Sequence, residues 1–138
     1  MIKWTITYPD YNGNEITEDF YFHYNKAELM EMNFNADGAY SEFIKRIGNN
    51  RDYKALGQEF KQIILGAYGV KSDNGKVFRK SPEATRDFEQ SEAYPTLYME
   101  LIADTDKMVK FVRGLVPKDL QGELNAPTAV PNASPTIV

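Results

Sequence analysis

The chain opens with IKWTITYPDYNGNEITEDFYFHY (residues 2–24), in which apolar and polar side chains alternate on both sides of a turn. Successive residues of a strand point to opposite faces of its sheet, so this alternation predicts two strands with one apolar face. That face would carry Ile2, Trp4, Ile6, Tyr8, Phe20, Phe22 and Tyr24. The intervening Asn12-Gly13 strongly favours a hairpin turn. Because an isolated hairpin is only marginally stable, we expect its apolar face to pack on the helices that follow.

Helical patterns follow this first hairpin. The first helix is expected after Asn25, whose spacing from Glu28 is typical of a capping box. A second helix is predicted over residues 38–47. A third follows Asp52 as its cap, with apolar residues at helical spacing up to about residue 67.

The next segment, residues 70–80, predicts a second small hairpin near residue 75. Its centre is Asn74-Gly75, two residues that tolerate the positive φ of tight turns. Directly after it, Ser81-Pro82 is typical of a helix start, with Ser as the N-cap and Pro in the first turn. Phe88 is the main apolar anchor of that short helix.

The last two predicted helices follow a proline. Pro95 predicts a break, after which Leu97 and Leu101 continue on a helical face. Asp104 predicts the cap of a final helix, which Pro117 terminates.

The composition changes from Lys118 onward, where Pro127, Pro131 and Pro135 interrupt small and polar residues. Such a segment cannot bury enough surface to offset a chain entropy of ~1–2 kcal/mol per residue. We therefore predict a flexible tail at 118–138. The remainder, 1–117, is expected to form a single α+β domain: an N-terminal β-hairpin packed on a mostly helical domain, with the second small hairpin near residue 75.

Bulk properties exclude several classes of function. The 138 residues carry a net charge of −4, which disfavours duplex nucleic acid as the main partner. There is no cysteine, hence no thiolate metal site and no cysteine nucleophile. No apolar run reaches the ~20 residues of a membrane span, and the N-terminus does not resemble an export signal. We expect a cytosolic protein without membrane partners.

No set of residues suggests catalysis. His23 is the only histidine, and no Gly-x-Ser-x-Gly sequence accompanies it. It lies on the polar-leaning face of a strand, where a surface histidine is the expected interpretation. Asp73-Asn74-Gly75 resembles part of a calcium loop, but position 81 is Ser where that loop needs Glu. We predict no catalytic, cofactor-binding or metal-binding residue, and a protein that is not an enzyme.

A local basic group accompanies the second hairpin. It consists of Lys71, Lys76, Arg79 and Lys80. One interpretation is a nucleic-acid site, in which bases stack on the neighbouring aromatic side chains. The favoured alternative is a solvated hairpin edge, where lysine discourages strand-to-strand aggregation.

Two pairs of apolar residues are candidate partner contacts. Val77 and Phe78 are adjacent in a predicted strand and point to opposite faces, so at least one is expected to miss the core. Tyr94 and Tyr98 lie one helical turn apart. The alternative for both pairs is ordinary packing within the domain.

Several segments together resemble the tail assembly chaperones of long-tailed bacteriophages. They are FYF (residues 20–22), NKAEL (25–29), GAYGVKSDNGKVFRKS (66–81), Phe88, SEAY (91–94) and LYMEL (97–101). The resemblance implies a non-enzymatic protein of the host cytoplasm that keeps the tape-measure protein soluble while the tail tube polymerises on it. It also implies self-association, with the tail tube protein as a second candidate partner.

Two other hypotheses compete with this one. The chain could be a structural component of the virion tail or its connector, retained in the mature particle. It could also be a small regulatory protein that binds nucleic acid through the basic group of residues 71–80.

Overall fold

A computed structural model describes residues 1–32 and 53–118. The helix predicted over 38–47, the proposed Asp52 cap and the tail beyond Lys118 lie outside the described residues.

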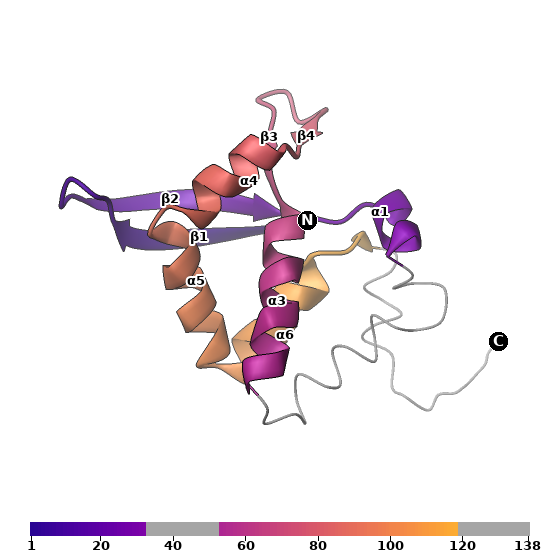
Figure 1. Cartoon of the computed structure of the whole chain (residues 1–138). Coiled ribbons are helices and arrows are strands. Elements are labelled where there is room, and N and C mark those ends of the chain that lie inside the picture. Colours follow the sequence, from indigo (N-terminus) through magenta and orange to yellow (C-terminus); the bar gives the residue numbers. More distant parts are fainter. Residues whose placement is uncertain (33–52, 119–138) are drawn as a thin grey trace.

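The described strands form one antiparallel sheet in the order β1-β2-β3-β4 (Figure 1). β1 (Ile2–Pro9) and β2 (Glu15–Phe22) make the long N-terminal hairpin. β3 (Tyr68–Lys71) and β4 (Phe78–Arg79) make the short one. Both hairpins predicted from the sequence are confirmed.

The alternation of the first hairpin becomes two different sheet faces. The register opposes Ile2 to Phe22 and Trp4 to Phe20, which places these four side chains on the apolar face. The opposite face carries polar, exposed side chains, among them Lys3, Thr5, Thr7, Thr17 and Asp19. Gly13 has a φ of +85°, as the Asn-Gly turn requires.

Helices supply the rest of the fold. They are α1 (Lys26–Glu31), α3 (Tyr53–Ala67), α4 (Pro82–Glu89), α5 (Ala93–Ile102) and α6 (Thr105–Gly114). Ring contacts from α4 and α6 and the close approach of α5 to β1 place these helices on the apolar face of the sheet. The predicted α+β class is confirmed. No helix in the parts of the chain that the structure describes is long and apolar enough to cross a bilayer.

Three predicted helix starts are confirmed by their hydrogen bonds. Asn25 and Glu28 form a reciprocal capping box, with distances of 2.8 and 2.9 Å. The Ser81 side chain caps α4, with Pro82 as the first helical residue. Asp104 accepts two backbone N–H groups at the start of α6. Each cap satisfies backbone donors that the first helical turn leaves unpaired.

The predicted break at Pro95 is misplaced. α4 ends at Glu89 and α5 begins at Ala93, so the chain turns over residues 90–92. Pro95 lies in the first turn of α5, where a residue has no intrahelical acceptor for its N–H and proline is tolerated.

Aromatic rings fill the interface between sheet and helices. Phe22 is completely buried, and its ring centroid lies 5.0 Å from Phe111, 5.7 Å from Phe88 and 5.9 Å from Tyr68. Tyr68 and Phe88 stack at 4.5 Å with nearly parallel planes. β2, β3, α4 and α6 therefore meet on one side chain.

Replacing Phe22 by Ala should remove these contacts and leave a cavity. We expect the free energy of unfolding to fall by about 3–5 kcal/mol, measured by urea denaturation. The control is Tyr21→Ala on the polar face of the same strand, for which we expect a loss of about 1 kcal/mol or less. Equal losses in the two variants would contradict this account of the core.

Candidate functional site

The β3–β4 hairpin extends away from the long strands and the helices (Figure 1). Its turn closes with a hydrogen bond of 2.8 Å from the Ser72 N–H to the Val77 carbonyl. Gly75 has a φ of +76°, and the Asn74 side chain accepts the Lys76 N–H at 3.0 Å. The turn predicted at Asn74-Gly75 is therefore confirmed as a hairpin turn.

Two valines lie together on one face of this hairpin. Val70 opposes Arg79 in the register, and Val77 precedes Arg79 by two residues, so both valines share a face. Each leaves 46% of its surface exposed. We call Val70 and Val77 the valine pair. The sequence identified Val77 but missed Val70, because the face of Val70 follows only from the observed pairing of β3 with β4.

Phe78 lies on the other face of the hairpin. Its ring covers Gly69 so closely that a β-carbon there would be 2.6 Å from the nearest ring atom. The Phe78 and His23 rings also pack in a T-shaped arrangement, with centroids 6.3 Å apart. Phe78 is half-buried, and it fixes the hairpin to the sheet while Val77 faces outward.

Tyr94 and Tyr98 lie on α5, in a different part of the fold. The Tyr94 ring lies 5.9 Å from Phe88 and 5.9 Å from Tyr98. The Tyr98 ring lies 6.4 Å from Phe60, and its hydroxyl lies close above Gly57. Both tyrosines are half-buried, and burial raises the pKa of Tyr94 to about 12. Their use as partner contacts stays a prediction.

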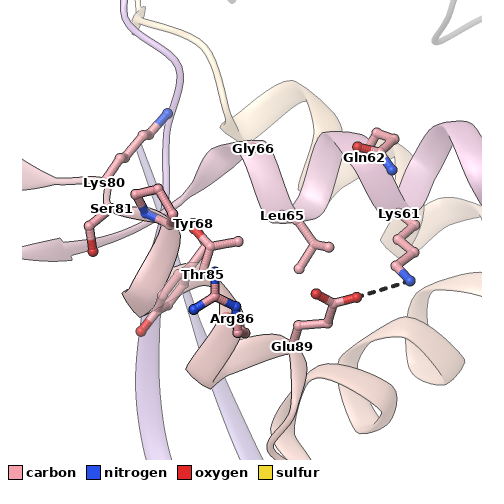
Figure 2. A pocket seen from close by; sticks show the side chains of 11 residues that line it. Lys61, Gln62, Leu65, Gly66, Tyr68, Lys80, Ser81, Thr85, Arg86 and Glu89 are labelled. Atoms are coloured by element: carbon pink, nitrogen blue, oxygen red, sulfur yellow. Dashed lines mark ion pairs between the residues drawn. The ribbon is translucent and has the colours of Figure 1, made fainter.

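A cleft of about 620 Å³ lies between α3 and α4 (Figure 2). Leu65 and Tyr68 contribute apolar surface from one side, and Pro82 and Thr85 from the other. Lys61 on α3 and Glu89 on α4 form an ion pair of 3.0 Å between the two helices. The sequence did not reveal this cleft, because its two walls come from segments separated by the whole second hairpin.

The predicted basic group does not form one solvated patch. The Lys80 ammonium pairs with Glu28 at 2.7 Å and lies 4.5 Å from the centre of the Tyr24 ring. Burial lowers the pKa of Lys80, and Glu28 partly restores it. Lys71 instead lies over the Tyr21 ring at 5.3 Å. Lys80 is therefore a half-buried structural cation, contrary to its prediction as part of a solvated edge.

His23 is also more enclosed than predicted. It is half-buried, and its Nδ1 is buried without a hydrogen-bond partner. The prediction of a simple surface histidine is wrong, because the Phe78 ring covers the face of the sheet on which His23 lies. Burial, followed by the positive charges of the N-terminus and Lys80, lowers the pKa of His23.

The described portion of the chain contains no set of side chains that could hold a metal ion. Residues 1–32 and 53–118 contain no group of three or more His, Cys, Asp or Glu side chains placed to hold an ion. Among the exposed features of this part of the structure, the valine pair brings two apolar side chains together, and the cleft between α3 and α4 offers a concave surface.

Comparison with known proteins returns one family. The family model described as "Phage tail assembly chaperone" matches residues 1–136. No curated protein and no solved structure matches the chain.

The environment of His23 predicts a measurable titration. Since the neutral imidazole is favoured in the folded state, we expect its pKa to lie below 6.5, measured by NMR on the only histidine of the chain. The reference is the same chain in urea, which should titrate near ~6.5. Because the unfolded chain binds a proton on His23 more readily than the folded one, protonation favours unfolding. The stability that neutral His23 contributes is therefore present above pH ~6.5 and is lost as the pH falls through the folded pKa. A folded pKa equal to or above that in urea would contradict the environment described here.

Proposed function

We propose, from the premise that this chain belongs to the phage tail assembly chaperone family, that it binds the tape-measure protein and keeps it soluble during tail tube assembly. The observation that carries the proposal is the valine pair on the extended hairpin. Apolar side chains exposed together on a protein surface are candidate contacts for another polypeptide.

The size of the valine pair indicates a weak contact. Complete burial of a valine side chain is worth ~1.5–3 kcal/mol, and each of these valines is already half covered. The pair can therefore contribute roughly 2 kcal/mol, less than the 4–15 kcal/mol that association costs in lost freedom. A single hairpin cannot hold a partner alone. Several copies or further contacts are required.

Self-association meets this requirement. When associated copies bind one long tape-measure chain at several places, the first contact raises the effective concentration of the chain at the other copies. The overall affinity then rises although no single contact is stronger. Weak contacts of this kind can also be exchanged one at a time, which suits displacement by tail tube subunits. We include the tube protein as a second partner on this ground.

The proposed role requires no bond-making chemistry. The protein acts by covering apolar surface of its partner, in the host cytoplasm where the tail is assembled. The polar outer face of the long hairpin, with Thr5, Thr7 and Asp19 exposed, is consistent with a protein that itself stays in solution.

Co-expression tests the function directly. We expect the tape-measure protein of the same phage to be recovered in the soluble fraction when both are expressed, and to aggregate when expressed alone. A soluble fraction that does not change when this chain is present would overturn the proposal.

The double substitution Val70→Thr with Val77→Thr tests the surface. Threonine keeps the β-branched shape while replacing a methyl group by a hydroxyl. We expect the soluble share of the tape-measure protein to fall by roughly half or more, because a small loss at each contact multiplies over several copies.

The matched control is Met99→Thr, which changes another exposed apolar residue, 62% exposed, on α5. It should leave the soluble share unchanged. Circular dichroism of the three purified proteins shows whether the fold is retained. If the valine variant holds the tape-measure protein as well as the parent chain does, the valine pair is not the contact surface.

A further inference from the structure

We infer that the cleft between α3 and α4 binds an acidic amphipathic helix of a protein partner. The inference deepens the proposed function and rests on it, since it gives the tape-measure protein a second contact of defined chemistry.

The walls of the cleft are two helix faces. Lys61, Gln62, Leu65 and Gly66 recur at the spacing of one side of α3, and Pro82, Thr85, Arg86 and Glu89 at that of one side of α4. Tyr68, the first residue of β3, also lines the cleft, together with Lys80 and Ser81, which follow β4 (Figure 2). Eight residues of α4 span about 12 Å, roughly two turns of a helix seated between them. A third helix can therefore lay one face into this groove.

The charges of the cleft differ in sign from those of the whole chain. In the part of the chain that the structure describes, three cationic side chains line it, Lys61, Lys80 and Arg86, against the one carboxylate of Glu89. The chain itself carries a net charge of −4. A partner with carboxylates would therefore meet an excess of positive charge at this part of the surface.

Two of these cations already bind carboxylates within the chain. Lys61 binds the Glu89 carboxylate, and Lys80 binds Glu28. Arg86 is exposed on the wall of the cleft, and its guanidinium can bind a carboxylate through two parallel hydrogen bonds. Arg86 is thus the residue that we expect to recognise an acidic partner.

The apolar surface of the cleft is better suited to bind a helix than a single-stranded nucleic acid. Nucleic-acid grooves of that type offer exposed aromatic faces on which bases stack. Among the described residues, Tyr68 is the only aromatic one that lines the cleft, and Phe88 already stacks against its ring at 4.5 Å. Leu65 and Pro82 instead offer aliphatic surface, which suits the apolar stripe of an amphipathic helix.

The test is fluorescence anisotropy with two synthetic helical peptides, one carrying Glu around a Leu stripe and one in which every Glu is Lys. We expect the acidic peptide to bind at least about ten-fold more tightly than the basic one, and less tightly as salt is raised. Arg86→Glu should weaken binding of the acidic peptide about ten-fold, because the guanidinium that binds a peptide carboxylate is replaced by a carboxylate that repels it. Arg79→Glu is the matched control on an exposed arginine outside the cleft, and should change binding less than about two-fold.

Each other result overturns the inference. Equal affinity for the two peptides would exclude charge recognition, and an unchanged affinity in Arg86→Glu would exclude the cleft. Binding of single-stranded DNA that is lost in Arg86→Glu, without binding of the acidic peptide, would make the cleft a nucleic-acid site. If the peptides fail to bind while co-expression still keeps the tape-measure protein soluble, the cleft inference fails and the proposed function stands.

Discussion

The burial of one face of the N-terminal hairpin is the constraint on which the rest of the structure depends. Two strands alone would be marginal in water. Here Phe22 joins the sheet to α4 and α6 through ring contacts, and Tyr24 donates its hydroxyl to the Ile63 carbonyl of α3 at 2.7 Å. Backbone bonds continue the connection, from His23 N–H to Ala67 and from Tyr24 N–H to Leu115. The hairpin is thus stabilised by segments that lie far from it in the sequence.

The same packing determines how the second hairpin is presented. Tyr68 at the start of β3 stacks on Phe88 of the core, and Phe78 of β4 contacts His23, so both strands of the short hairpin pack against the rest of the fold. By alternation, the valine pair shares a face with Tyr68; the core covers Tyr68 there, while each valine stays 46% exposed. A rigid base lowers the entropy that a partner must overcome on binding, which matters most where each contact is weak.

Local features could be predicted from the sequence because their physics is local. Asn12-Gly13 and Asn74-Gly75 favour turns through their own backbone, and Asn25 caps a helix through a hydrogen bond to a residue three positions away. The enclosure of His23 could not be predicted, since alternation assigns a side chain to a face but not to what covers that face. The cleft could not be predicted for a similar reason, because its two walls, α3 and α4, come together only in the folded chain. The break predicted at Pro95 is wrong, because a proline is compatible with the first turn of a helix as well as with the position after its end.

The valine pair and the cleft respond to different conditions, and this difference matters for the proposed role, in which the protein binds a partner and later releases it. Apolar contact at the valine pair changes little with ionic strength, whereas carboxylate binding at Arg86 is screened by salt. Lys80 lies at the boundary between them: it follows β4, lines the cleft and pairs with Glu28 of α1. An incoming carboxylate competes with Glu28 for Lys80, so part of its binding energy is spent on breaking an existing pair. That cost keeps the second contact weak as well. Two weak contacts of different physical origin bind a long chain firmly when both are engaged, and each can be replaced separately by a competing subunit.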